Sequence, residues 1–221
     1  MFTILGMIIF LDGGVCTGKT SLVREFEKDN FVVIPEHTDL IDEDEEKRIF
    51  SLNDDNLILK EFMKIEKVRN MMILSALIEK RDIVVDRSVM STLSFYYAIG
   101  KYELIENYLK ENQVNYPEKI YFLDVPYEER TRRAYQRGDD KEKISSDILY
   151  KKSFNEKIKE FFLNFQKTTK IEYIDTSNIN SKQLKRYILN RELTTQSNVL
   201  NDKEYKEEII TDKYYELNFD I

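Results

Sequence analysis

A short stretch near the N-terminus has the residue types and the spacing of a phosphate-binding loop, or P-loop. It fits the pattern G-x-x-x-x-G-K-[ST] and consists of Gly13, Gly14, Val15, Cys16, Thr17, Gly18, Lys19 and Thr20. The glycines allow backbone N–H groups to surround phosphate oxygens, and the positive end of a following helix adds to the attraction. In such a loop the lysine reaches the β- and γ-phosphates, and the final hydroxyl ligates Mg²⁺. The sequence therefore predicts an ATP and Mg²⁺ site, in which Lys19 contacts phosphate, Thr20 ligates the metal and Ser21 completes the loop contacts.

A second group of polar residues follows a short apolar run further along the chain. Asp86, Arg87 and Ser88 come directly after the run Ile83–Val85. In an open α/β sheet, ligands collect at the carboxyl ends of the strands, so these side chains would face the same crevice as the P-loop. There Asp86 can hold Mg²⁺ through a water and Arg87 can clamp a phosphate. The alternative is a structural ion pair between strand ends.

Three arginines further along the chain have the spacing of one helical face. Arg130, Arg133 and Arg137 are separated by three and four residues. Guanidinium groups placed just before the turn at Gly138 suit a lid that closes over phosphates. Alternatively, they pair with neighbouring Glu and Asp residues on a solvated, charged helix.

Five short apolar runs, rich in β-branched or aromatic residues and bounded by charged or turn residues, predict strands. They are Met7–Leu11, Phe31–Ile34, Ile83–Val85, Ile120–Leu123 and Ile171–Ile174. Each run is continuous rather than alternating, as expected for strands covered on both faces, and segments with helical spacing lie between them. We therefore expect an α/β fold, with a five-stranded parallel sheet and helices on both faces.

Two of the intervening segments have the clearest helical spacing. One carries an apolar stripe made of Phe154, Ile158, Phe161, Phe162 and Phe165. The other lies between Leu57 and Lys80, and the residues that can share its apolar face are Phe62, Ile65, Met72 and Ala76. In this helix we expect Glu66, Arg69 and Asn70 on other faces.

Length and composition limit the number of domains and the kinds of partner. The 221 residues, 42% of them apolar, suffice for one sizeable core, which we expect over residues 1–195, before an unassigned acidic tail at 196–221. With 34 Lys and Arg against 41 Asp and Glu, the net charge of -7 disfavours a nucleic-acid partner but not a small anionic ligand. The single Cys16 excludes an intrachain disulfide, and no run approaches the roughly 18 to 20 apolar residues that span a bilayer. We expect a cytoplasmic protein that binds small molecules and neither nucleic acid nor membrane.

Together these motifs resemble those of the nucleotide and deoxynucleoside kinases among the P-loop proteins, and most closely those of thymidylate kinase. The signature D-R-[aromatic]-x-x-S-x-x-A-[aromatic] of that family is similar to Asp86, Arg87, Ser91, Ser94 and Phe95 here, with Ser88 replacing the first aromatic and Ser94 the alanine. Its pattern P-x-x-x-x-[apolar]-L-D-V-P, followed by an arginine-bearing helix and R-G-x-D, looks like residues 117–140. The resemblance extends over roughly residues 7–192.

This resemblance implies a three-layer P-loop kinase fold with a short lid at about residues 133–146, phosphoryl transfer that depends on ATP and Mg²⁺, and a homodimer. In that family a P-loop without a basic residue accompanies arginines in the lid, which implies catalytic roles for Arg133 and Arg137. It also implies a substrate site that contains Arg69 as the arginine for the acceptor phosphate, Ser91, and Phe95 as the ring that stacks on a nucleobase.

The segment after the second predicted strand departs from the family pattern. Thymidylate kinases have a motif of the type Arg-Glu-Pro-Gly-Gly-Thr there, whereas this chain has Pro35, Glu36 and His37. A carboxylate at this place looks like the general base of deoxynucleoside kinases, whose E-R-S motif is also similar to Asp86, Arg87 and Ser88. We expect the sole histidine, His37, to be a loop residue rather than a catalyst.

The two kinds of acceptor need different chemistry. A nucleoside 5′-hydroxyl must lose a proton when it attacks, whereas a monophosphate is already anionic and needs cationic clamps. Glu36 therefore favours a nucleoside and Arg69 favours a monophosphate. Our first expectation is phosphoryl transfer to a (deoxy)nucleoside monophosphate, the second is a deoxynucleoside kinase with Glu36 as base, and the third is a non-catalytic module that binds ATP.

Overall fold

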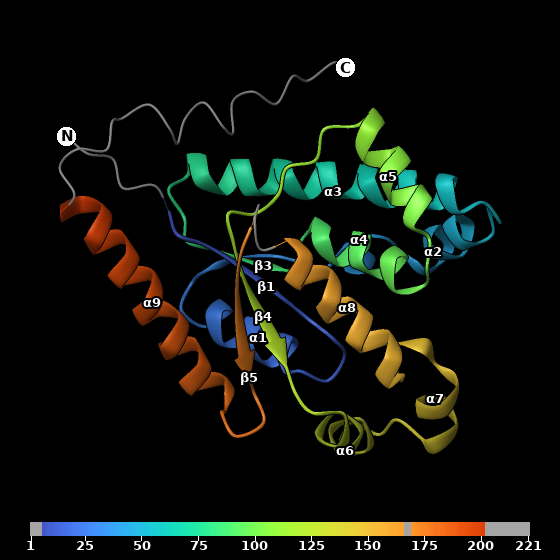
Figure 1. Cartoon of the computed structure of the whole chain (residues 1–221). Helices are drawn as coiled ribbons and strands as arrows, with labels where there is room; N and C mark the ends of the chain where they lie inside the picture. Colours follow the sequence, from blue (N-terminus) through green and yellow to red (C-terminus); the bar gives the residue numbers. More distant parts are fainter. Residues whose placement is uncertain (1–5, 166–168, 202–221) are drawn as a thin grey trace.

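Five strands and the helices that cover them make up the part of the chain that this computed structural model describes, residues 6–165 and 169–201 (Figure 1). The strands are β1 (Ile8–Gly13), β2 (Val32–Ile34), β3 (Ile83–Asp86), β4 (Lys119–Asp124) and β5 (Lys170–Asp175). The α-helices are α1 (Lys19–Glu27), α2 (Glu43–Phe50), α3 (Asp55–Ile78), α4 (Val89–Ala98), α5 (Tyr102–Glu111), α6 (Tyr127–Arg137), α7 (Lys141–Ser146), α8 (Lys152–Asn164) and α9 (Ser181–Asn201). Two short 3₁₀ helices, η1 (His37–Leu40) and η2 (Ile148–Tyr150), precede α2 and α8 respectively.

The strands form one parallel sheet in the order β2-β3-β1-β4-β5. β1 lies in the middle, with Ile9 opposite Val84 of β3 and Leu11 opposite Tyr121 of β4. This confirms the predicted α/β fold with a five-stranded parallel sheet, and each strand ends within two residues of its predicted bounds. Because all strands run the same way, their carboxyl ends lie at one edge, which carries the polar residues discussed below.

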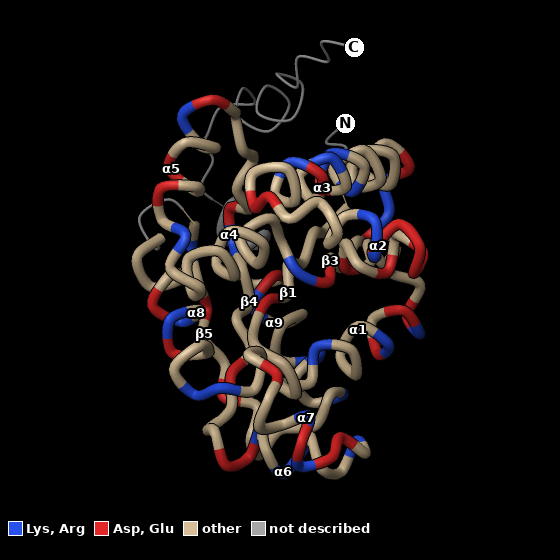
Figure 2. Tube along the Cα trace, turned by 90° about the vertical axis from the view of Figure 1, so that its right-hand side faces the viewer, with Lys and Arg blue, Asp and Glu red and all other residues tan. Residues whose placement is uncertain are grey.

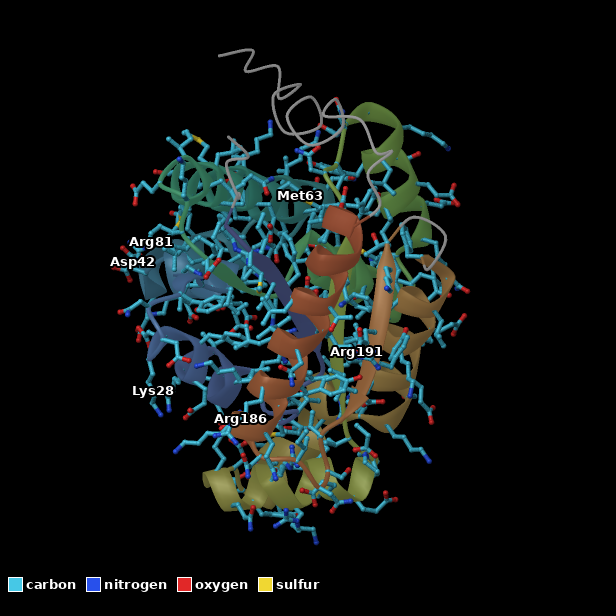
Figure 3. The ribbon with its side chains drawn as sticks, turned by 90° about the vertical axis from the view of Figure 1, so that its left-hand side faces the viewer. Lys28, Asp42, Met63, Arg81, Arg186 and Arg191 are labelled. Atoms are coloured by element: carbon cyan, nitrogen blue, oxygen red, sulfur yellow. The ribbon has the colours of Figure 1, made fainter. Side chains whose placement is uncertain are left out.

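One face of the sheet packs against α1 and α9. Leu22 and Phe26 of α1 and Leu184 and Ile188 of α9 belong to one buried cluster with Leu11 in the central strand. Figure 3 shows α9 crossing this side of the molecule, with Arg186 and Arg191 on that helix. The first layer of the three is therefore formed by the helix that follows the P-loop and the last described helix.

The opposite face packs against α3, α4, α5 and α8. Leu93 of α4 and Phe162 of α8 contact the cluster around Phe122 of β4, whereas Ile73 of α3 packs with Val85 of β3. Figure 1 shows α3 lying across one end of this layer, with α4 and α8 side by side below it. Helices on both faces confirm the expected three layers.

Side chains at the starts of two of these helices fix where each helix begins. The Asp54 carboxylate accepts a hydrogen bond of 2.8 Å from the Asn56 N–H at the start of α3. At the start of α4, the Ser88 hydroxyl accepts one of 3.2 Å from the Met90 N–H. Such caps satisfy N–H groups that the first turn leaves without an intrahelical partner.

The buried face of α3 differs from the predicted one. Glu66 and Arg69 lie on the buried side together with Phe62 and Ile73, so the expectation that these two charged residues occupy other faces is wrong. Burial is tolerated because the Arg69 Nη1 donates a hydrogen bond of 2.6 Å to Glu66 Oε1, which neutralises both charges. The predicted helix at Phe154–Phe165 is confirmed as α8, with Phe154, Phe161 and Phe162 buried.

The last described helix extends beyond the expected end of the domain. α9 continues through residue 195 to Asn201, and the remainder of the acidic tail, 202–221, lies outside the described residues. Within the described ranges, none of the helices has the length and apolar content needed to cross a membrane.

Candidate active site

A cavity of about 310 Å³ opens where the P-loop meets the carboxyl ends of β2 and β3 and the helices α3, α4 and α8. Its polar end is lined by Asp12, Glu36, Arg87 and Ser91. Its apolar walls include Phe50, Phe62, Phe95, Tyr96, Phe154 and Phe162. A polar end beside an aromatic chamber suits a small molecule that has a reactive polar group and a flat or apolar body.

The P-loop holds Lys19 with its amine turned back onto the loop. The Lys19 Nζ donates hydrogen bonds to the carbonyl oxygens of Gly13, at 2.8 Å, and Gly14, at 2.7 Å. Burial, together with repulsion from Arg87, lowers the pKa of Lys19 to about 7, although the carboxylates of Asp86 and Glu36 oppose this shift. Phosphate oxygens bound in the loop would raise this pKa again and keep Lys19 positively charged.

The shape of the loop depends on glycine at its first position. Gly13 has a φ of 136°, and a Cβ atom there would lie 2.1 Å from the Leu123 carbonyl oxygen of β4. Only glycine permits this approach. Within the loop, the Thr17 hydroxyl donates a hydrogen bond of 3.0 Å to the Gly14 carbonyl oxygen. Val15 lines the cavity, and Cys16 packs beside it against α6 and α7.

Glu36 and Arg87 meet at the polar end of the cavity. Arg87 Nε lies 2.7 Å from Glu36 Oε2, and Arg87 Nη1 donates a hydrogen bond of 3.2 Å to the Gly13 carbonyl oxygen. Burial alone would raise the pKa of Glu36, but attraction to Arg87 and then to Lys19 outweighs it and holds that pKa below its ordinary value. Glu36 is therefore an ionised carboxylate at neutral pH, within the cavity.

Asp86 and Thr20 have the donor chemistry expected of a Mg²⁺ site. Asp86 Oδ1 is buried and has no hydrogen-bond partner among the described residues, and burial raises the pKa of its carboxyl group. Thr20 is exposed in the first turn of α1, beside Ser21. Carboxylate and hydroxyl oxygens suit Mg²⁺, which commonly keeps several waters and shares its ligands with phosphates. In the described ranges, no cluster of three or more His, Cys, Asp or Glu side chains could hold a metal ion.

Asp12 was missed in the sequence, although it lies directly before the P-loop. Its carboxylate is fully buried and accepts hydrogen bonds from the Ser88 hydroxyl at 2.6 Å, the Ser88 N–H at 3.1 Å and the Ser91 hydroxyl. Burial raises the pKa of Asp12, although these hydrogen bonds oppose the shift. Asp12 thereby joins the end of β1 to the start of α4. The sequence feature that could have identified Asp12 is its position as the one charged residue at the end of an otherwise apolar strand.

Arg69 lies outside the cavity. It is 1% exposed, and its guanidinium donates to the carbonyl oxygens of Pro35 at 2.8 Å, Asp86 at 2.8 Å and Arg87 at 2.6 Å, in addition to the Glu66 carboxylate. These contacts join the ends of β2 and β3. For Arg69 to bind an acceptor phosphate, this set of buried hydrogen bonds would first have to break.

Arg133 and Arg137, which were expected to lie in a lid, are also paired within the protein. Arg133 donates to the Thr176 carbonyl at 2.7 Å and to Glu129 at 2.6 Å, and it reaches the Cys16 carbonyl at 3.4 Å. Arg137 pairs with Asp139 at 2.6 Å and is half exposed. Figure 2 shows basic and acidic residues interspersed along α6 and α7. On its outer side, α6 is therefore a solvated helix whose arginines pair with Glu and Asp residues, which was the alternative considered from the sequence.

Two further residues lie where the aromatic chamber meets the polar end. Phe95 is 37% exposed, lines the cavity and packs edge-on against Phe154, with 5.7 Å between ring centroids. His37 lines the cavity and packs edge-on against Phe62 at 4.8 Å. Burial, with repulsion from Arg69 and Arg87, lowers the pKa of His37 to about 4, so its ring is neutral at physiological pH.

Comparisons with known proteins agree with this fold. The family model described as thymidylate kinase matches residues 58–188, which is more than half of the chain. Thymidylate kinase from Candida albicans is similar in structure, with a TM-score of 0.63 at 16% identity, covering 88% of this chain and 94% of that one. No curated protein matches the chain.

Other solved structures share the same architecture. A deoxyadenosine kinase from M. mycoides has a TM-score of 0.58 at 17% identity, covering 85% of this chain and 100% of that one. Thymidylate kinase from Ehrlichia chaffeensis has a TM-score of 0.56 at 18% identity, covering 86% and 100%. At these identities the likeness is one of fold, and the fold is found with both kinds of acceptor.

Proposed function

The chain belongs to the thymidylate kinase family and is a kinase, and we propose that it transfers the γ-phosphoryl group of ATP to the 5′-hydroxyl of a deoxynucleoside. The observation that carries this proposal is the position of Glu36, an ionised carboxylate on the cavity wall, oriented by Arg87 at 2.7 Å. A hydroxyl acceptor needs such a base, whereas an anionic acceptor does not.

The charges that line the cavity support the same acceptor. Asp12, Glu36 and Glu46 are acidic, Arg87 is the single arginine or lysine among the lining residues, and His37 is neutral. Arg87 is already paired with Glu36. A monophosphate would place two further negative charges in this surrounding, and its attraction to one paired cation would be offset by repulsion from the carboxylates.

In the proposed reaction the acceptor 5′-hydroxyl oxygen attacks the γ-phosphorus as the bond from that phosphorus to the β–γ bridging oxygen breaks. The hydroxyl proton passes to Glu36, and ADP leaves with the former bridging oxygen. Phosphoryl transfer proceeds through a loose transition state, so a carboxylate of low pKa is sufficient for this late proton transfer. Lys19 and the P-loop N–H groups stabilise the negative charge on the phosphates.

The remaining predicted residues have supporting roles in this proposal. Mg²⁺ held by Thr20 and, through water, Asp86 would neutralise the β- and γ-phosphate oxygens. Phe95 would stack on the nucleobase, and Ser91 would hold Asp12 in position rather than contact phosphate. The segment at about 133–146, with Arg133 and Arg137, would serve as the lid.

A monophosphate acceptor remains the second candidate, because the family match favours it. The test is ADP release by the purified protein with ATP and Mg²⁺ against all deoxynucleosides and their 5′-monophosphates, with a blank that lacks acceptor. Turnover with nucleosides supports the proposal. Turnover with monophosphates alone overturns it in favour of the second candidate, and silence with every acceptor favours a non-catalytic ATP-binding module.

Family resemblance also supports a homodimer. Val68, Met71 and Ile78 are more than half exposed, and their spacing of three and seven residues places them on one face of α3. Light scattering on the purified protein would measure the mass, and substitution of Met71 by Glu should convert a dimer to a monomer.

A further inference from the structure

Among Arg130, Arg133 and Arg137, which share one face of α6, Arg130 is the one with buried donor atoms that lack a partner among the described residues. It is 4% exposed, and its Nε and Nη1 atoms have no hydrogen-bond partner among the described residues. Arg133 and Arg137, by contrast, pair with carboxylates and carbonyl oxygens. A buried guanidinium with two unmatched donors is costly, because its lost hydration is not replaced.

The unmatched end of Arg130 faces the P-loop. A Cβ atom built on Gly14 would lie 2.3 Å from Arg130 Nη1 and 2.5 Å from Asn155 Oδ1. Gly14 and Asn155 both line the cavity, so the guanidinium lies next to residues of the cavity wall. The lack of a side chain at Gly14 is what allows a cation this close to the loop.

The other end of Arg130 is anchored. Its Nη2 donates a hydrogen bond of 3.1 Å to Asp124 Oδ1, at the carboxyl end of β4. Asp124 has other partners, because Lys159 lies 2.9 Å from its Oδ2 and the Val125 N–H donates to its Oδ1 at 2.9 Å. Asp124 therefore orients Arg130 but does not depend on it.

We propose that Arg130 is a phosphate-binding residue of the ATP site, and that its Nε and Nη1 hydrogens are taken up by oxygens of the bound triphosphate. This inference rests on the proposed function, since it requires ATP in the P-loop. It adds a second cation beside Lys19, because the variable positions of the P-loop, Val15, Cys16 and Thr17, carry no charge. Guanidinium and phosphate match in geometry and form charge-assisted hydrogen bonds in pairs.

The proposal makes an unusual prediction about stability. For an arginine that holds the fold together, removal should lower the melting temperature of the free protein. For Arg130, the variant Arg130→Met removes two unmatched donors and leaves Asp124 with its Lys159 and Val125 partners. The melting temperature of free Arg130→Met should therefore equal or exceed that of the wild type, while ATP binding weakens.

The experiment measures Mg²⁺-ATP binding by calorimetry without an acceptor, and melting with and without ATP. The dissociation constant for ATP should rise at least about ten-fold in Arg130→Met, because two charge-assisted hydrogen bonds are lost. Arg132→Gln is the matched control, since Arg132 lies on the same helix but is 55% exposed and paired with Glu129. This control should bind ATP as the wild type does.

Two outcomes would overturn the inference. One is a dissociation constant for ATP in Arg130→Met within about two-fold of the wild-type value. The other is a melting temperature of free Arg130→Met well below that of the wild type, with the ATP-induced increase in melting temperature intact.

If Arg130→Met does not fold, Arg130→Lys is the second variant, because it keeps the charge near Asp124 but lacks the guanidinium fork. Wild-type affinity in Arg130→Lys would then count against the proposal, and a several-fold loss would support it. Absence of ATP binding by the wild type would overturn the proposed function as well, whereas equal binding by wild type and Arg130→Met overturns this inference alone.

Discussion

Glu36 and Arg87 lie 2.7 Å apart at the ends of two neighbouring strands, β2 and β3, although 50 positions separate them in the chain. Arg87 adopts a positive φ of 65°, a conformation that is uncommon for a non-glycine residue. Its Nη1 also reaches the Gly13 carbonyl oxygen. The pair therefore couples the proposed base directly to the P-loop, so that acceptor and phosphate sites are held in one geometry.

Replacing the base should affect catalysis much more than ATP binding. Glu36→Gln should lower kcat with a deoxynucleoside acceptor by about 100- to 10,000-fold, the usual contribution of a general base. The dissociation constant for ATP should change little, because Glu36 lines the cavity that we propose for the acceptor. Steady-state kinetics and calorimetry measure the two quantities, and Asp39→Asn, at an exposed position of η1, is the control. A kcat that falls less than about ten-fold would reject Glu36 as the base.

The lowered pKa of Lys19 predicts a dependence of ATP binding on pH. In the free protein burial and Arg87 lower that pKa to about 7, and phosphate oxygens should raise it again. ATP binding should then take up a proton above about pH 7, and the affinity that Lys19 contributes should fall by up to about ten-fold per pH unit.

The measurement compares the wild type with Lys19→Ala between about pH 7 and about pH 9. Protonation of ATP and of its Mg²⁺ complex affects both proteins equally, so it cancels in the comparison. The ratio of their association constants should decline with rising pH. Calorimetry in buffers of different ionisation enthalpy reports the proton uptake. Lys19→Ala should also abolish phosphoryl transfer without unfolding the protein, and a ratio that does not change with pH would contradict the assigned shift.

The single histidine gives a direct test of burial at the cavity. Since burial lowers the pKa of His37 from 6.5 to about 4, the unfolded chain binds a proton in that window and the folded protein does not. Stability should therefore fall as pH drops from 6.5 toward 4, and His37→Asn should remove part of this slope. Proton NMR of the one imidazole ring gives the pKa without assignment, and a midpoint near 6.5 would show that the ring is exposed in solution.

Arg69 should act on stability rather than on substrate binding. Arg69→Met leaves Glu66 buried without a partner, which should lower the free energy of unfolding by about 3 to 5 kcal/mol. The double variant Glu66→Leu with Arg69→Met removes the stranded charge and should recover part of this loss. Urea denaturation measures both. If Arg69→Met keeps wild-type stability and raises KM for a monophosphate, the acceptor role expected from the family resemblance is correct instead.

The strands and the P-loop were predictable because both leave strong local patterns. Continuous apolar runs such as Ile83–Val85 mark strands buried on both faces, and the glycine and lysine spacing of the loop is specific. Because the carboxyl ends of parallel strands meet at one edge of the sheet, Arg87 was expected beside the P-loop, and it does contact the Gly13 carbonyl oxygen.

The buried charged residues were harder to place, since polarity normally indicates exposure. The buried residues of α3 include a series spaced by four and three residues, as in an apolar stripe: Phe62, Glu66, Arg69, Ile73 and Ala76. Because two of the five are charged, the stripe was not recognised in the sequence. The orientation of Arg130 depends on the absence of a side chain at Gly14, more than a hundred positions away. Such a relation exists only in three dimensions and has no local signal.

The contacts of Arg133 set where a hinge can lie. This side chain bridges the Cys16 carbonyl in the loop after β1 and the Thr176 and Ser177 carbonyls after β5, so that α6 is clamped between them. A swing of the whole helix would break the clamp, whereas Gly138, with a φ of 96°, allows rotation just beyond it. We therefore expect the proposed lid to pivot at Gly138, so that the turn and α7 move while Arg133, at the base of the lid, keeps its contacts with the P-loop.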